Sequence, residues 1–219
     1  MKQIAHIETP FKEKFGVPRQ AGLVDYEARV VFEPEYRVAE AVRGLEEFEY
    51  IWLIWQFHLA ERDEWSPTVR PPRLGGNKRV GVFATRSPFR PNAIGLSSVR
   101  LLRVEPGPVL VVSGADLVDG TPIFDIKPYI AYADAHPDAR SGFAQEAPRP
   151  LLQVVDDHGL LLQLPEAHRQ ALEECLAHDP RPHYQHDADR VYVMPFDRWE
   201  VRFCVNDDSV EVLGLAIGG

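Results

Sequence analysis

Short runs of alternating or continuous apolar residues, separated by loops with proline and glycine, are the main pattern along this 219-residue chain. The most apolar run, YIWLIWQFHL at Tyr50–Leu59, is rich in aromatic and β-branched residues, which predicts a buried strand. Shorter runs predict further strands. These are Gln3–Glu8, Ala28–Phe32, Arg79–Ala84, Ser97–Val104, Val109–Ser113, Thr121–Ile126, Leu151–Val155, Val191–Met194, Trp199–Val205 and Val210–Leu215.

Helical spacing occurs in only two segments. Apolar residues recur every three or four positions over Tyr36–Leu45 and over Pro165–His178, which predicts one early and one late helix. Thr9–Asp25 is predicted to be a polar loop, and Ala133–Pro150 a connector. Because a βαβ rhythm is missing, we predict a mainly β fold. A single small β-barrel domain would span residues 1–145, and a small C-terminal α+β domain residues 151–219.

Composition and missing motifs narrow the class of protein. Cys175 and Cys204 form no close motif, which argues against a disulfide framework or a cysteine zinc site and fits a reducing, cytoplasmic location. The histidines lack metal-ligand spacing, so we expect no metal. The first residues lack the apolar core of a signal peptide, and the run Tyr50–Ala60 is too short to span a bilayer. No dinucleotide, Walker or G-x-S-x-G motif occurs.

The charge is distributed unevenly along the chain. The formal net charge is −9, yet Ser66–Val104 contains eight cations and no acid, so the rest carries −17 (−9 minus 8). The eight cations are Arg70, Arg73, Lys78, Arg79, Arg86, Arg90, Arg100 and Arg103. Such a segment can attract RNA to one face of an acidic protein. Alternatively, the cations lie on several faces and pair with acids from elsewhere in the chain.

Two proline-containing loops could bind a ligand. GVPRQAG at Gly16–Gly22 offers Arg19 and Gln20 in a stiff turn, and such side chains can bind a carboxylate or a purine edge. RPPRLGG at Arg70–Gly76 holds two arginines on a rigid turn, which suits phosphate recognition. The alternatives are an ordinary surface loop and a polar crossover.

TRSPFRPNAIG at Thr85–Gly95 is the most distinctive loop. The carbonyl of Asn92 could accept a hydrogen bond from the amino group of a base and thereby orient the lone pair of that nitrogen. Arg86 and Arg90 could hold phosphates or a carboxylate nearby. The alternative is a strained connection between strands with solvated arginines.

A fourth stretch, DLVDGTPIFDIKPY at Asp116–Tyr129, combines acids with a predicted strand. Strand alternation places Phe124 and Ile126 on one face. Asp125 and Lys127 then share the other face, either as an ion pair on a pocket wall or as an ordinary exposed pair.

Taken in order, these motifs resemble those of the TrmO-type (TsaA-like, YaeB) tRNA methyltransferases, from Ile4 to about Leu215. The residues that carry the resemblance are KEKFGVPRQ at Lys12–Gln20, AVRGLEEF at Ala41–Phe48, RPPRLGGN at Arg70–Asn77, GVFATRSPFRPNAIG at Gly81–Gly95, DLVDGTPIFDIKPY at Asp116–Tyr129 and DPRPHY at Asp179–Tyr184. One position departs from the pattern, because relatives usually read RPNPIG and this chain has Ala93 in place of the proline.

The resemblance implies a homodimeric, non-Rossmann methyltransferase that binds S-adenosyl-L-methionine on a single β-barrel. The implied reaction is methylation of N6 of N6-threonylcarbamoyladenosine at position 37 of certain tRNAs, giving m6t6A37. Matching positions imply cofactor contacts at Pro18, Arg19, Gln20, His58, Leu59, Arg86, Leu96, Asp116, Leu117, Val118 and Asp119. The tRNA contacts expected in the basic loops are Arg70, Arg73, Lys78 and Arg90.

Three residues are expected to act in catalysis. Asn92 would orient the acceptor nitrogen, and Asp125, steered by Lys127, would take its proton. Two other functions remain open on the sequence alone: a non-catalytic S-adenosylmethionine-binding RNA module, and a methyltransferase for a different adenine or a small molecule.

Overall fold

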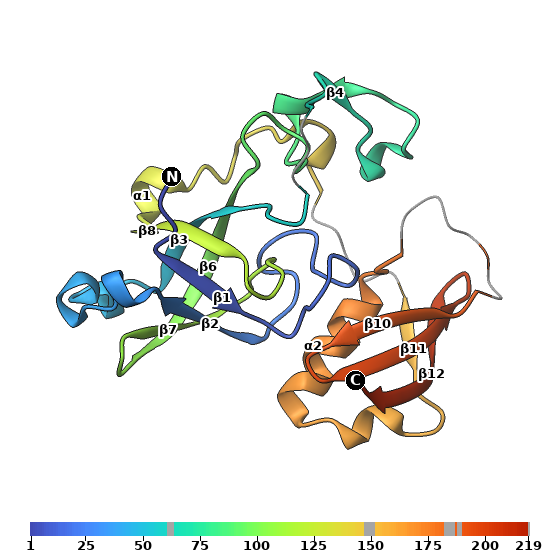
Figure 1. Ribbon diagram of the computed structural model, residues 1–219. Coiled ribbons are helices and arrows are strands. Elements are labelled where there is room, and N and C mark those ends of the chain that lie inside the picture. The colour runs from blue at the N-terminus through green and yellow to red at the C-terminus, as the bar shows by residue number, and fades with distance from the viewer. Residues whose placement is uncertain (61–63, 147–151, 182–186, 188–189, 219) are drawn as a thin grey trace.

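The computed structural model describes residues 1–60, 64–146, 152–181, 187 and 190–218, which form two domains joined by a connector (Figure 1). The first domain is a closed barrel of six strands, and the second is a four-stranded sheet with a helix. The mainly β fold class with a small C-terminal α+β domain is therefore confirmed. The domain limits at residues 145 and 151 stay a prediction, because residues 147–151 lie outside the described residues.

Six antiparallel strands close the barrel in the order β1-β2-β7-β6-β3-β8. They are β1 (Ala5–Glu8), β2 (Glu27–Phe32), β3 (Tyr50–Gln56), β6 (Ile94–Glu105), β7 (Val109–Ser113) and β8 (Pro122–Pro128). Alternate residues face the interior, so Ile51, Leu53 and Trp55 of β3 are buried while the residues between them are partly exposed. Closure pairs every strand on both sides, which leaves the sheet without an open edge.

The segment Thr9–Asp25 runs between the two domains (Figure 1), and it is not the polar loop that its sequence predicts, because its aromatic side chains pack against the C-terminal sheet. Phe11 is fully buried, and its ring packs edge-on against Phe196 of the C-terminal sheet at 5.6 Å. Phe15 stacks on Phe203 at 6.2 Å. Charged residues separate these two aromatic residues in the sequence, so the pattern did not predict that they pack between the domains. Their contacts make one continuous core through both domains.

The C-terminal domain follows its prediction closely. Its sheet has the order β10-β11-β12-β9, in which only β12 and β9 are parallel. The elements are β9 (Gln153–Val155), a 3-10 turn at Leu160–Gln163, α2 (Glu166–Ala177), β10 (Tyr192–Phe196), β11 (Trp199–Val205) and β12 (Ser209–Ile217). The buried stripe of α2, which contains Leu172 and Leu176, contributes to the shared core, as its helical spacing predicted.

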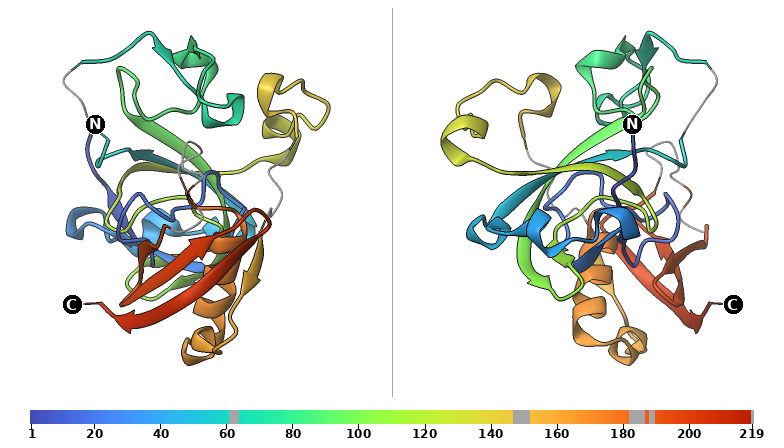
Figure 2. Two further views of the ribbon diagram at one scale, coloured as in Figure 1. Left: turned by 90° about the vertical axis from the view of Figure 1, so that its right-hand side faces the viewer. Right: turned by 60° about the vertical axis from the view of Figure 1, so that its left-hand side comes forward.

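A protruding hairpin, here called the basic arm (residues 65–84), stands on the barrel. It contains β4 (Thr68–Val69) and β5 (Val80–Gly81), with 3-10 turns at Pro72–Leu74 and Val82–Ala84. The connector, with α1 (Ala131–Asp134) and a 3-10 turn at Gly142–Ala144, lies at the same end of the molecule, away from the C-terminal sheet (Figure 2). Among the described residues, no helix is both long and apolar enough to cross a membrane.

The helix predicted over Tyr36–Leu45 is wrong. Three separate 3-10 turns occupy the region, at Pro34–Tyr36, Ala39–Val42 and Leu45–Glu47. The guanidinium of Arg37 donates to the carbonyl of Phe32 at 2.7 and 3.1 Å, which holds the chain against the end of β2. Val38 is consequently extended and 46% exposed, so the apolar stripe does not form one continuous helical face.

Two strand predictions also need correction. Arg79–Ala84 forms only the short strand β5 before a 3-10 turn begins at Val82, whose buried side chain anchors that turn. In β8 the register with β3 shifts by one residue, so Ile123 rather than Phe124 shares the core-facing side with Ile126. Asp125 remains on the outer face, as predicted, where it pairs with Lys127.

Candidate active site

A buried chain of polar groups lies where β3, β6 and the end of β7 meet. The indole Nε1 of Trp55 donates to the hydroxyl of Ser97 at 2.9 Å, and that hydroxyl donates to Asp116 at 2.5 Å. Gly95 faces the same indole across the β3–β6 pair, and a Cβ at this position would overlap the ring. The missing side chain at Gly95 therefore leaves room for the Trp55 ring, and the short side chain of Ser97 can accept the hydrogen bond from its N–H.

The carboxyl of Asp116 has a perturbed pKa. Burial raises the pKa of its carboxyl, while the Ser97 hydroxyl, backbone N–H groups and the charge of Arg86 act in the opposite direction. Asp116 is partly exposed, and a partly buried carboxylate that faces a cation and hydrogen-bond donors is a common feature of ligand sites. Of the predicted cofactor residues, this one has the surroundings that best fit binding.

The loop Gly16–Gly22 meets Arg86 directly. The Gln20 side chain accepts from the Arg86 guanidinium at 2.6 Å and donates to the carbonyl of Arg19 at 2.6 Å. The structure thus brings together Gln20, Arg86 and Asp116, which are far apart in the sequence. Arg86 has a neutral partner and one acid nearby, so it can still bind an anionic group.

The Arg19 side chain turns toward the C-terminal domain. Its guanidinium donates to the carbonyls of Asp179 and Arg181 at 2.9 and 3.0 Å. The carboxylate of Asp179 in turn accepts two hydrogen bonds from the Arg181 guanidinium, at 2.8 and 3.0 Å. Burial alone would raise the pKa of Asp179, but the hydrogen bonds and charge of Arg181 outweigh it and hold that pKa below its usual value.

These contacts give the predicted cofactor residue Arg19 a second task, which is to fix the loop against the other domain. They also explain part of the motif at Asp179–Tyr184, whose last three residues lie outside the described residues. Pro18 stiffens the same loop from inside, since its φ angle is fixed.

Asn92 is exposed and lies two residues before the start of β6. Its backbone carbonyl accepts from Ile94, and the neighbouring carbonyl of Ala93 accepts from Phe57. These bonds hold the backbone at Ala93, where the family resemblance leads us to expect a proline. Within the described part of the chain the side-chain amide of Asn92 makes no hydrogen bond, so both of its polar groups can meet a ligand.

Asp125 and Lys127 are not beside Asn92 within one chain. They form an exposed pair at 2.9 Å on the outer face of β8. The register aligns Asp125 with Leu96 through Ile54 of β3, whereas Asn92 precedes Leu96 by four residues. Asn92 lies in the bend before β6, and β3 separates β6 from the β8 strand that carries Asp125, so strand pairing does not bring the two side chains together. Leu96 itself is 54% exposed on this outer face.

The remaining predicted cofactor residues differ in how they could reach a ligand. His58 and the exposed Leu59 follow β3, and the Leu59 carbonyl accepts from Lys14 at 3.0 Å, which brings Lys12–Gln20 alongside. Leu117 is fully buried in the core, and its carbonyl accepts from the Thr9 hydroxyl. A cofactor could therefore not contact its side chain.

Val118 and Asp119 form the turn that follows Leu117. The carboxylate of Asp119 accepts from the Thr9 backbone and the Lys12 ammonium, both at 2.9 Å. It therefore holds the first part of the Thr9–Asp25 segment, and the carbonyl of Val118 is engaged by Thr121.

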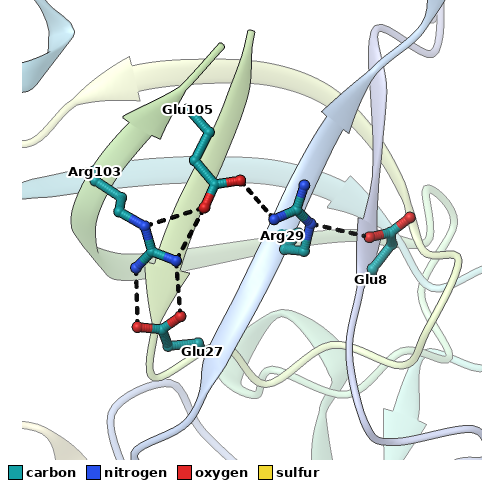
Figure 3. A network of polar contacts seen from close by, with 5 residues as sticks. All are labelled: Glu8, Glu27, Arg29, Arg103 and Glu105. Carbon is teal, nitrogen blue, oxygen red and sulfur yellow. Dashed lines mark hydrogen bonds and ion pairs between the residues drawn. The ribbon is translucent and has the colours of Figure 1, made fainter. Parts of the chain in front are cut away.

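The eight cations of Ser66–Val104 divide into two groups. Arg100 pairs with Glu49, and Arg103 belongs to a network on the outside of the barrel with Glu27, Glu105, Arg29 and Glu8 (Figure 3). In this network the hydrogen bond from Arg29 lowers the pKa of Glu105. Among the described residues, the other six cations form no ion pair with a carboxylate. They are Arg70, Arg73, Lys78, Arg79, Arg86 and Arg90.

The alternative of scattered, paired cations is confirmed for two of the eight, and attraction of RNA by the others stays a prediction. Scattered, paired arginines account for Arg100 and Arg103, whereas four cations stay together on the basic arm. Arg90 donates to the carbonyls of Thr85 and Ser87 at 3.1 and 3.4 Å, so it holds its own loop. Its contact with tRNA stays a prediction.

Comparison with known proteins identifies the family to which this fold and site belong. A profile described as the tRNA-methyltransferase O N-terminal domain matches residues 6–135, and one described as the TrmO C-terminal domain matches residues 148–217. The chain belongs to the TrmO family. Its predicted site residues all lie inside the first of the two matched segments.

Relatives in the TrmO family resemble this chain over most of its length. A protein of Escherichia coli K12 named tRNA (adenine(37)-N6)-methyltransferase is 44% identical, and the match covers 98% of this chain and 96% of the relative. A protein of Pseudomonas aeruginosa, provisionally named an S-adenosylmethionine-dependent methyltransferase, is 48% identical, and the match covers 83% of this chain and 81% of the relative. A crystal structure of TrmO from P. aeruginosa superimposes with a TM-score of 0.77 at 38% identity, covering 99% and 95% of the two chains.

Sequence reasoning missed some residues that the structure brings to this candidate site. Trp55 and Ser97 looked like strand residues, since nothing in a strand pattern marks an interior polar chain. Asp179 and Arg181 were noticed only as a motif of the family resemblance. Within the described residues, no cluster of His, Cys, Asp and Glu could hold a metal ion.

Proposed function

We propose that this protein is an S-adenosylmethionine-dependent methyltransferase that methylates N6 of adenine 37 in tRNA. The observation that carries the proposal is the 44% identity, over 98% of the chain, to the E. coli relative of that name. Both domains contribute to this similarity, so the proposal does not depend on one shared module. A tRNA substrate also fits the cytoplasmic location expected from the cysteine content.

The chemistry of the site supports binding of the methyl donor. S-adenosylmethionine carries an α-amino acid, a ribose and an adenine, and it supplies a methyl group bound to a sulfonium. Arg86, whose partner Gln20 is neutral, can bind a carboxylate of that donor. Asp116 can accept from its amino or hydroxyl groups. The exposed Leu59 can cover an apolar ring.

At the acceptor, we propose N6-threonylcarbamoyladenosine as the substrate and m6t6A37 as the product. The target N–H lies between the adenine ring and a carbamoyl group, which makes it more acidic than a simple amine. The amide of Asn92, which makes no hydrogen bond within the described residues, can accept one from the base and so orient that nitrogen. Orientation of this kind accounts for much of the rate in a direct transfer, where the reacting atoms must approach to about 3–3.5 Å in line.

We also propose that the enzyme is a homodimer in which Asp125 takes the proton. Within one chain, Asp125 lies on the outer face of the barrel, away from Asn92. The proposal is that the second copy supplies the base, where the Lys127 ammonium pairs with the Asp125 carboxylate at 2.9 Å.

Nucleoside mass spectrometry tests the proposed function. Bulk tRNA from cells with and without the gene is digested, and the gene should account for N6-methyl-threonylcarbamoyladenosine. Purified protein is then incubated with S-adenosylmethionine and either threonylcarbamoylated or unmodified tRNA, and only the former should be methylated. If the protein binds both ligands without transfer, it is a binding module. If another nucleoside or a small molecule gains the methyl group, the assigned substrate is wrong.

A further inference from the structure

Two aromatic side chains stand exposed at the base of the basic arm. Trp65 is 52% exposed and Phe83 is 72% exposed, and their rings lie nearly parallel, with centroids 6.2 Å apart and planes inclined by 29°. Neither ring belongs to the hydrophobic core. Large aromatic rings that remain in water while touching each other are available to a partner.

The hairpin of the arm fixes this pair in place. Strands β4 and β5 pair Thr68 with Gly81, and the Val82 N–H donates to the carbonyl of Pro67 at 3.0 Å. Trp65 and Phe83 lie just outside these pairs, one on each chain segment. Because Val82 is buried and anchors the turn, the ring that follows it points outward. The two rings are thus held ready before any partner binds.

Charge favours a polyanion as that partner. Four cations and no acid occur on the arm, and the cations do not pair with carboxylates among the described residues. Arg73 and Arg79 instead donate to neutral acceptors, the carbonyl of Glu146 at 2.5 Å and the hydroxyl of Thr68 at 3.3 Å. An interface that paired arm with arm in a second copy would bring like charges together.

The basic arm leads directly into the loop Thr85–Gly95, which carries Asn92. Phe83 precedes Arg86 by three residues and Asn92 by nine. The Thr85 hydroxyl donates to the carbonyl of Val82 at 2.8 Å, so the turn that carries Phe83 is tied to the start of that loop. A nucleotide on the aromatic pair would therefore belong to the same short stretch of RNA as the base that receives the methyl group.

We propose that Trp65 and Phe83 form a stacking platform for an unpaired nucleobase of the tRNA anticodon loop, adjacent to the adenine that is methylated. The proposal rests on the proposed tRNA substrate and adds a base-binding site to it. Single-stranded loops are recognised largely by splaying out bases and stacking them on aromatic rings. Stacking tolerates any base, so the platform would bind the loop without selecting its sequence, while the arm cations neutralise phosphates.

The test compares Trp65→Leu and Phe83→Leu with Trp65→Phe, which keeps a ring, and with Leu162→Ala, which removes a side chain 70% exposed in the C-terminal domain. Binding of a synthetic anticodon stem-loop, binding of S-adenosylmethionine and molar mass by light scattering are measured. Both leucine variants should bind RNA about 5- to 150-fold more weakly, the range expected for loss of one stacked base. Cofactor affinity and mass should stay unchanged, and the two control variants should bind nearly as wild type.

Salt dependence separates stacking from charge. The slope of log K against log salt should be unaltered in Trp65→Leu, whereas Lys78→Gln should lower it by about 1. Unchanged RNA affinity in both leucine variants overturns the platform. A fall in molar mass also overturns it, because the rings would then belong to an interface between copies. The proposed function fails separately, if wild-type protein binds the stem-loop on these rings but methylates no nucleoside.

Discussion

Removal of the Ser97 hydroxyl is the sharpest test of the buried polar chain. Ser97 is 2% exposed and bridges the Trp55 indole at 2.9 Å and Asp116 at 2.5 Å. Ser97→Ala leaves the buried indole N–H without a partner and removes a donor from the carboxylate. A buried polar group left unsatisfied costs about 1–3 kcal/mol, and the indole N–H is that group here, because the carboxylate keeps its backbone donors; the free energy of unfolding should therefore fall by about 1–3 kcal/mol. For a protein of this size the fall in Tm is then about 2–12 °C.

Ser98→Ala is the matched control, because Ser98 is the next residue of β6 and faces outward opposite Trp52. Urea unfolding should place it within about 0.5 kcal/mol of wild type. Calorimetric titration should also reveal weaker S-adenosylmethionine binding in Ser97→Ala alone, since Asp116 is then free to turn. If the two alanine variants unfold at the same denaturant concentration and bind the cofactor equally, the hydrogen bonds from Trp55 through Ser97 to Asp116 stabilise neither the fold nor the cofactor site.

Three further outcomes follow from the contacts described. Arg181→Ala removes the two side-chain hydrogen bonds to Asp179 that hold the turn whose carbonyls accept from Arg19, so it should loosen that anchor and weaken S-adenosylmethionine binding several-fold while leaving stem-loop affinity unchanged; equal losses for both ligands would indicate general unfolding instead. Asn92→Ala and Asp125→Asn should each depress turnover and spare cofactor binding, and mixing the two variants should restore activity through mixed dimers; no recovery would refute a base supplied by the partner subunit. Since burial raises the pKa of Asp116, wild-type stability should fall as pH rises from the ordinary value of 3.8 through the raised one, and Asp116→Asn should lack that loss in pH-dependent unfolding curves.

The strand pattern was most informative where one face of a strand is buried. Val109–Ser113 and Trp199–Val205 have the bounds that their sequences predict, because residues inside the core and outside it alternate or run continuously apolar. Where a single side chain redirected the backbone, the pattern failed. Arg37 broke the expected helix by holding the Phe32 carbonyl, and a bulge in β8 reversed the faces of Phe124 and Ile123.

For the candidate site, too, the sequence determined some features and the tertiary structure others. The sequence by itself determined the family, the fold class and the residue types of the site, since the motifs are continuous in the chain and need no distances. Only the tertiary structure decided which of those residues meet: Gln20 and Arg86 touch, Arg19 turns to the C-terminal domain, and Asp125 is separated from Asn92. Barrel closure sets these neighbours through strand register, and register depends on pairings between distant segments that a local pattern does not contain.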